Sequence, residues 1–273
     1  MIAACAEAYN VLQDEAALEA AVRSADFILT RMLKDGRLLR AFKDGQARLN
    51  GYLDDYAFFA AALLDLYQAT FDRRYLAQAL LLHERMIAQF WNEEEGSFSF
   101  TSADHEALIS RPKSPYDHSL PSGMSVATQT MLRLSALTGS GADLARAERL
   151  LRLFRNPMED NPFGFGNLLC ALDWYVETPR EVVVVGDHTG ADTRALLEAI
   201  HLEFVPNKVI LVVGPHELGG LPAVGELLAG KGQVDCKATA YVCRKFACSA
   251  PVTEPADLKS ILQNVEYRTP NVE

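Results

Sequence analysis

Two neighbouring carboxylates, Asp54 and Asp55, stand where a long polar stretch gives way to an apolar segment. Paired carboxylates at the mouth of a cavity can serve as general acid and general base, which is the arrangement that glycoside chemistry uses. The alternative is that they cap the helix that follows and stabilise its positive end. Because adjacent helical positions diverge by about 100°, we expect only one to face a cavity, with Tyr56 beside it as a substrate-binding candidate.

A second polar group lies just before another apolar segment, between residues 111 and 123. An Asp-His pair such as Asp117 and His118 can relay protons near neutral pH, and the helix N-terminus beyond could hold an anionic group. The alternative is a packed, proline-containing loop in which Ser122 caps the helix. We take Asp117 and His118 as catalytic candidates. The substrate-binding candidates of this loop are Arg111, Tyr116 and Ser122.

Aromatic residues gather in the same long connection. Trp91, Phe98 and Phe100 precede the polar loop, and such rings can form a wall on which a sugar stacks. The alternative is a hydrophobic cluster that only holds the loop together. We retain Trp91 and Phe98 as substrate-binding candidates.

The five cysteines do not form the dense framework of a small disulfide-rich domain. We therefore expect free thiols in a reducing cytoplasm. Cys236, Cys243 and Cys248 lack a clear fourth ligand and match none of the usual zinc spacings, so no metal is expected. Cys243 and Cys248 fit a hairpin, and His83 falls on an apolar stripe, where a packing role is expected.

Composition excludes several classes of function. The net charge of −10 and an isoelectric point near 5.1 argue against a nucleic-acid partner, because such binding needs a cationic surface. The first ten residues lack the cationic region of a secretory signal, and no apolar run reaches the length that spans a bilayer. We expect a soluble cytoplasmic protein without membrane contact.

Helical periodicity fills the first two-thirds of the chain. The expected helices cover residues 2–12, a segment introduced by Asp14 that runs to residue 33, and residues 53–67, 72–90, 122–138, 143–154 and 165–176. Asp14 is the expected N-cap of the second helix, and Gly139 the expected C-cap of the fifth. The helix from residue 53 is apolar on nearly every side, which is typical of a buried helix.

The links between these helices alternate in length. The first, third and fifth are minimal, whereas the others, residues 34–52, 92–121 and 155–164, are long. Antiparallel helices then place all long links at one end. This pattern predicts a mainly α fold over residues 1–179, a partial α/α toroid of the six-hairpin glycosidase type, whose long links surround a cavity. A plain helical solenoid is the alternative.

A small α/β lobe is expected over residues 180–273. Residues 181–187 and 209–213 read as buried strands, and Asp192 is the expected cap of a helix between them. Residues 241–243 and 246–248 predict a hairpin, and Pro255 fits the first turn of a final helix. The turn at 186–190 lacks both the dinucleotide fingerprint and the lysine of a P-loop, so no cofactor is expected.

Several strings resemble the bacterial YyaL type of protein, a family that includes a spermatogenesis-associated animal member. They are LDDYA at 53–57, LYQAT at 66–70, PSG at 121–123 with SVA at 125–127, VGD at 185–187, PNK at 206–208, TAYVC at 239–243 and CSAP at 248–251. Where the family tends to have Asn after PSG, this chain has Met124. The resemblance implies an N-terminal thioredoxin-like domain followed by a toroid, and hence that this chain is the C-terminal part of a larger protein.

Two functions follow as expectations. In the first, the intact parent processes or binds a carbohydrate, as a hydrolase or epimerase that uses Asp54, Asp55, Asp117 and His118. In the second, the toroid is a non-catalytic binding or scaffold module coupled to the thioredoxin-like domain. For this chain alone we expect no turnover, because part of the cavity wall is missing, and self-association through exposed toroid faces.

Overall fold

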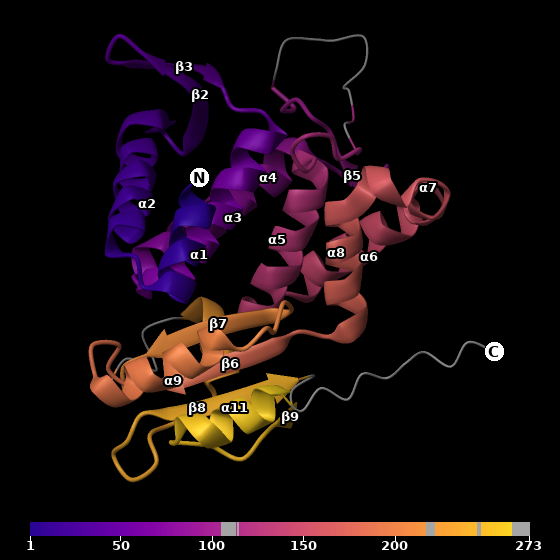
Figure 1. The fold of residues 1–273 in the computed structure, drawn as a ribbon. Coiled ribbons are helices and arrows are strands. Elements are labelled where there is room, and N and C mark those ends of the chain that lie inside the picture. The colour runs from indigo at the N-terminus through magenta and orange to yellow at the C-terminus, as the bar shows by residue number, and fades with distance from the viewer. Residues whose placement is uncertain (105–112, 114, 217–221, 245–246, 264–273) are drawn as a thin grey trace, which may run out of the picture. The chain divides into compact units, whose positions relative to one another are not determined.

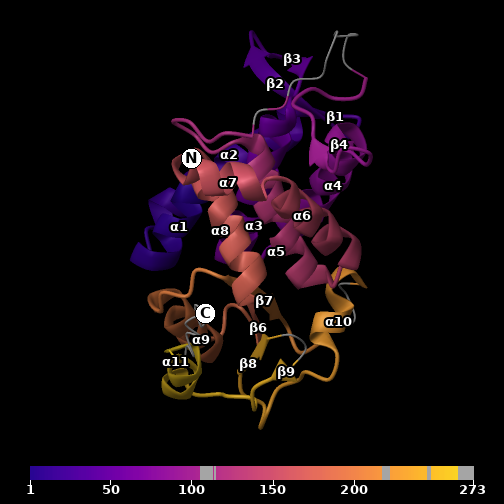
Figure 2. The same ribbon diagram turned by 90° about the vertical axis from the view of Figure 1, so that its right-hand side faces the viewer.

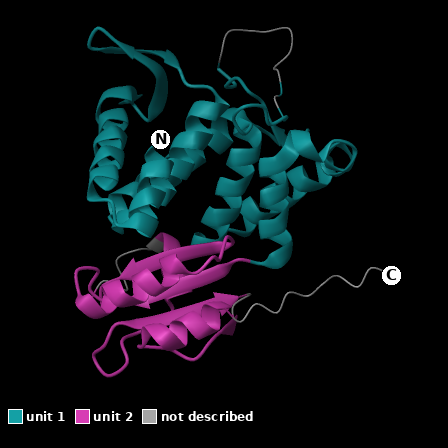
Figure 3. Ribbon diagram, viewed as in Figure 1, with its two compact units in different colours: residues 1–178 teal, residues 179–273 magenta. Residues whose placement is uncertain are grey.

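The computed structural model describes residues 1–104, 113, 115–216, 222–244 and 247–263, and the chain divides into two compact units, 1–178 and 179–273 (Figure 3). The first unit is built from helices (Figure 1). They are α1 (Ile2–Leu12), α2 (Glu15–Phe27), α3 (Leu53–Thr70), α4 (Arg73–Phe90), α5 (Gly123–Thr138), α6 (Gly141–Leu153), α7 (Arg155–Asp160) and α8 (Gly166–Glu177).

These helices form hairpins whose inner members pack side by side. Helices α1, α3, α5 and α8 contact one another in that order, whereas α2, α4 and α6 lie against their own hairpin partners. Among the inner helices, α3 is buried on nearly all sides and α5 almost as fully, while α4 and α6 bury one face. This arrangement confirms the predicted mainly α, partial α/α toroid.

The helix ends follow the predicted local chemistry. The Asp14 carboxylate accepts from the N–H groups of residues 16 and 17 at the start of α2, and Ser122 Oγ accepts from Ser125 N at the start of α5. Gly139 ends α5 with φ 74°, a left-handed conformation that costs a glycine little. The predicted Asp14 cap and Gly139 C-cap are therefore confirmed, and Ser122 caps α5 as the alternative interpretation of its loop has it.

The long links contain structure that periodicity did not predict. A π-helical turn, Ile28–Met32, extends α2, and the first link holds strands β1 (Leu33–Lys34), β2 (Arg37–Lys43) and β3 (Gln46–Asn50). The second holds the antiparallel pair β4 (Trp91–Asn92) and β5 (Ser97–Phe98). The third holds α7 and a 3-10 turn, Pro162–Phe165. In each link these short elements contact one another: β1 pairs with β2 and β2 with β3, β4 pairs with β5, and α7 packs against the 3-10 turn.

The second unit is a four-stranded sheet in the order β7-β6-β8-β9. Strands β6 (Arg180–Val185) and β7 (Lys208–Val213) are parallel and joined by α9 (Ala191–Leu202), which confirms the predicted βαβ unit. Strand β8 (Thr239–Arg244) runs antiparallel to β6 and pairs with β9 (Ala247–Cys248), which confirms the hairpin. Helix α11 (Pro255–Gln263) lies beside α9 (Figure 2). A short 3-10 turn, Pro222–Val224, and α10 (Gly225–Leu228) complete the unit.

Two predictions for this unit are wrong. Gly190, not Asp192, is the N-cap of α9, because the Asp192 carboxylate instead accepts from Thr193 N at 2.9 Å and Ala238 N at 2.8 Å. Cys243 and Cys248 are not free thiols but form a disulfide, since the strand register places them directly opposite each other.

Candidate functional site

The three long links of the first unit meet on one rim. Arg37 in the first link pairs with Asp104 in the second, and the Tyr52 ring stacks on Phe100 with centroids 4.9 Å apart. The second link reaches the third through the hydrogen bond from Asp117 N to Gly164 O, at 2.8 Å. The links therefore gather at the N-terminal ends of α3, α5 and α8, as the alternation of link lengths predicts.

Asp54 lies where α3 meets α5. The Gly123 N–H, in the first turn of α5, donates to the Asp54 carboxylate. A Cβ added at Gly123 would clash with Asp54 Oδ1 and would lie only 2.9 Å from Asp54 Cα. The glycine is thus required for the close approach of the two helix ends, and Asp54 is half-buried at this junction.

Burial is the largest influence on Asp54 and raises the pKa of its carboxyl above the ordinary value. The charge of neighbouring Asp55 raises this pKa further, whereas the Gly123 N–H and the more distant Arg40 oppose the shift. A carboxyl that keeps its proton to higher pH is suited to donate it. Asp54 is therefore the acid of this rim whose surroundings match general acid chemistry.

Asp55 has a different position. Its Oδ2 accepts from the backbone N–H of Tyr52 at 2.8 Å, just before α3, and lies 3.3 Å from Arg40 Nη1. The Arg40 guanidinium also lies over the Tyr52 ring, 4.9 Å from its centroid. Asp55 thus holds the start of its own helix, as the capping alternative predicts, and points away from the α5 contact that Asp54 makes.

Asp117 joins two helix N-termini. Its Oδ1 accepts from Ser122 N at 2.7 Å and from Ser125 Oγ at 3.0 Å, and its Oδ2 accepts from Asn167 N at 2.7 Å. Asn167 Nδ2 also donates to Ser125 Oγ at 3.1 Å. Asp54 and Asp117 therefore hold consecutive backbone amides, those of residues 122 and 123, and lie at the same helix end.

The other candidates are divided between surface and core. Tyr116 and His118 are exposed on the rim, and Tyr116 packs against Phe165 with ring centroids 5.0 Å apart. The Asp117 carboxylate accepts from Ser122 N, Ser125 Oγ and Asn167 N, and among the described residues it makes no direct contact with the His118 side chain. Arg111 lies outside the described residues.

Three candidates offer no surface to a ligand in this structure. Tyr56 is fully buried, and its hydroxyl accepts from Leu38 N at 2.9 Å, which fixes β2 to α3. Phe98 is fully buried under Trp91, the two rings lying edge to face at 5.1 Å. Ser122 is buried as the cap of α5. The interpretation as a hydrophobic loop cluster therefore fits Phe98 better than a sugar-stacking wall, and Trp91 is only half-buried.

The sequence did not single out several residues that build the rim. They are Arg40, Tyr52, Ser125 and Asn167. Ser125 stands three residues after Ser122, and this spacing is the one signal that could have linked it to the cap. Asn167 joins the site only because α8 packs against α5, fifty residues later in the chain than Asp117. Met124, which replaces the family's usual amide, is buried in the core.

Within the part of the chain that the structure describes, no group of three or more His, Cys, Asp or Glu side chains is arranged to hold a metal ion. Over the same residues, none of the helices combines the length and apolar character that a membrane-spanning helix needs.

Comparison with known proteins places the chain in a family. The profile of the beta-L-arabinofuranosidase GH127 catalytic domain matches residues 1–152, which carry α1 to α6 and two of the three long links. The chain belongs to the GH127 catalytic-domain family. This GH127-type chain is also 30% identical to spermatogenesis-associated protein 20 of Homo sapiens and 31% identical to that of Rattus norvegicus. Each alignment covers 96% of this chain, and the resemblance predicted from its motifs is confirmed.

The chain spans about a third of the length of these curated relatives, 35% in both. A solved structure with a related backbone is cellobiose 2-epimerase from Bacillus thermoamylovorans. It aligns with a TM-score of 0.44 and 20% sequence identity, over 56% of this chain and 42% of that one.

Proposed function

We propose that the rim of the first unit binds a carbohydrate and that Asp54 donates the proton when the intact protein processes it. The observation that carries the proposal is the seclusion of Asp54 at the junction of α3 and α5, which raises the pKa of its carboxyl through burial. Membership of a family named for a glycoside hydrolase supports a sugar as the ligand.

The surroundings of Asp54 suit a sugar. Exposed Tyr116 and half-buried Phe100 offer apolar surface to ring C–H groups, and the exposed Arg40 guanidinium, which lies over the Tyr52 ring, offers hydrogen-bond donors to hydroxyls. A few polar groups among aromatic rings are typical of small-molecule sites.

The remaining acids serve the site indirectly in this proposal. Asp55 and Asp117 position the ends of α3, α5 and α8. His118, exposed on the same loop, is the proposed second proton-transfer group. Hydrolysis and epimerisation both need an acid and a base, so this assignment serves either reaction.

Ligand-detected NMR with a panel of pentoses and hexoses, including L-arabinose and D-glucose, tests the proposal. Asp54→Asn keeps an oxygen for the Gly123 N–H but removes the exchangeable carboxyl proton and charge. We expect it to weaken binding at least about fivefold, which corresponds to about 1 kcal/mol. The matched control is Asp160→Asn, at the exposed end of α7, which should bind the sugar as tightly as the unsubstituted chain does. Equal binding by both variants would refute the assignment of Asp54.

We expect no turnover by this chain alone. Its four inner helices form an open arc rather than a closed ring, so the rim surrounds a ligand on one side only. Aryl glycosides incubated with the chain should release their phenol no faster than they do without protein. Faster release would contradict this expectation.

One observation favours the alternative of a non-catalytic binding or scaffold module that works with a thioredoxin-like domain of a longer protein. The Asp55 carboxylate accepts from a backbone N–H and pairs with Arg40, and the Asp117 carboxylate accepts from two backbone N–H groups. Both side chains therefore stabilise helix ends, so two of the three aspartates have a structural role. In the full-length protein, sugar binding without any turnover would favour this module.

A further inference from the structure

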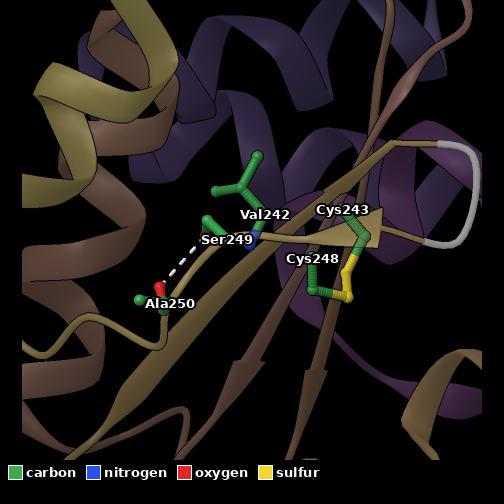
Figure 4. The surroundings of a disulfide bond; sticks show 5 residues. All are labelled: Val242, Cys243, Cys248, Ser249 and Ala250. Carbon is green, nitrogen blue, oxygen red and sulfur yellow. Dashed lines mark hydrogen bonds between the residues drawn. A yellow bond between two sulfur atoms is a disulfide. The ribbon is translucent and has the colours of Figure 1, made fainter.

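The cysteine pair of the second unit joins a buried sulfur to an exposed one. Cys243, in β8, is 1% exposed, whereas Cys248 is exposed on β9, the last strand of the sheet (Figure 4). An attacking thiol therefore reaches the bond from the Cys248 side. Thiol–disulfide exchange depends strongly on which sulfur an incoming thiolate can reach.

The bond is not needed to hold the two strands together. Ser249 N donates to Val242 O at 2.9 Å, immediately beyond the cysteines. Ala240 and Val252 exchange two further backbone hydrogen bonds, at 2.8 and 3.0 Å. The disulfide closes a loop of only five residues' separation, and short loops gain least from a cross-link. After the bond opens, the backbone ladder keeps the two sulfurs opposite each other and ready to rejoin.

An acidic residue stands opposite Cys243 on the neighbouring strand. Glu181 of β6 is the cross-strand neighbour of Cys243, and directly opposed residues of antiparallel strands share a face of the sheet. Burial raises the pKa of the Glu181 carboxyl, and Lys231 opposes this shift. Glu181 is therefore an acid that retains its proton to higher pH than usual, next to the sulfur that would leave.

We propose that Cys243 and Cys248 form an exchangeable disulfide that reacts with small monothiols at Cys248. A thiolate R–S⁻ attacks Cys248 Sγ, the bond to Cys243 breaks, and the electron pair leaves on Cys243 Sγ, which takes a proton from Glu181. The product is a mixed disulfide on Cys248. A second thiolate then attacks the sulfur of R, releases R–S–S–R and leaves the Cys248 thiolate, so that two thiols are oxidised as the protein bond is reduced.

This inference is independent of carbohydrate binding, and it relates the disulfide to the composition of the chain. Sparse cysteines led to the expectation of a reducing cytoplasm. A bond that small thiols open and close is compatible with such a compartment, whereas a bond that serves only stability is typical of secreted proteins.

The test uses the full chain with Cys5, Cys170 and Cys236, the free cysteines among the described residues, replaced by serine. The protein is equilibrated with mixtures of reduced and oxidised glutathione, quenched with acid, alkylated and mapped by mass spectrometry. We expect the pair to interconvert reversibly between disulfide and dithiol as the glutathione ratio changes. In Cys243→Ser the adduct should accumulate on Cys248. In Cys248→Ser the adduct on Cys243 should form at least about tenfold more slowly, because Cys243 is buried.

Two further measurements complete the test. Far-ultraviolet circular dichroism should show the same secondary structure before and after reduction, because the backbone ladder remains. Glu181→Gln should slow opening of the bond several-fold while Cys248 stays the modified sulfur. Reduction that requires denaturant or unfolds the unit would overturn the proposal, and so would equally fast modification of the two cysteines. An unchanged opening rate in Glu181→Gln would overturn the role of that carboxyl.

Discussion

Replacing Asp117 with alanine should loosen two inner helices at once. Its carboxylate accepts from Ser122 N and Asn167 N, both at 2.7 Å, and from Ser125 Oγ at 3.0 Å. The first two donors stand at the N-termini of α5 and α8, where backbone N–H groups have no partner within the helix. The substitution leaves donors of both helices without this acceptor.

The expected loss of unfolding free energy is about 3 kcal/mol. Removing a side-chain cap costs about 0.5–2 kcal/mol, and Asp117 serves two helices. Hydrogen bonds to charged groups contribute about 1.5–3 kcal/mol each, but water can replace part of them at a half-buried position. This loss is a large part of the free energy of unfolding of a typical protein, which is about 5–15 kcal/mol. Asp117→Asn keeps one oxygen acceptor and should lose about half as much.

Urea unfolding followed by far-ultraviolet circular dichroism measures the loss, and amide hydrogen exchange locates it. Protection should fall at residues 122 and 167 and stay unchanged in α2 and α4, which Asp117 does not contact. The matched control is Asp160→Ala, an exposed acid at the end of α7, which should change stability by less than about 0.5 kcal/mol. If Asp117→Ala were no more destabilising than this control, the carboxylate would not be holding the two helices together.

Three further predictions follow from single contacts. Gly123→Ala should force α5 away from Asp54 and cost about 1–3 kcal/mol, measured by urea unfolding; an unchanged midpoint would disprove the close approach. Burial alone would raise the pKa of Asp143, but the hydrogen bond from buried His83 holds this pKa below its usual value. Asp143→Asn should therefore lower the free energy of unfolding by about 2 kcal/mol at pH 7. The difference between the variant and the unsubstituted chain should shrink below about pH 4, where the Asp143 carboxyl takes up a proton. A difference that does not change with pH would contradict a role for the charge of Asp143. Phe163 is 96% exposed, so Phe163→Ser should reduce the self-association that we expect of this chain. Light scattering measures it, and a monomeric unsubstituted chain would refute the expectation.

Local chemistry made much of the first unit predictable. Asp14 and Ser122 cap helices because their side chains reach donors two or three residues away, and Gly139 ends one because its own φ is positive. The alternation of short and long links needs only chain order and antiparallel packing to place the rim. Such features depend on neighbours in the sequence, and each was confirmed.

The details of the site depend on contacts between distant segments. Which of Asp54 and Asp55 faces a neighbouring helix is decided by the approach of Gly123, almost seventy residues later in the chain. Asp117 looks like a reactive acid beside His118 in the sequence, yet α8 supplies a backbone partner for it through Asn167. The disulfide depends on strand register, which the spacing of Cys243 and Cys248 alone does not fix.

The close approach at Gly123 ties the architecture of the rim to its chemistry. Without a side chain at this position, the first turn of α5 can pack against the backbone of Asp54, and the resulting burial outweighs the hydrogen bond that the Gly123 N–H donates. The net effect is a raised pKa at Asp54, whereas Asp55 is turned toward Arg40. Met124, one position later, is buried. The environment of the proposed acid is therefore made by the glycine, by the helix end and by the neighbouring charges of Asp55 and Arg40.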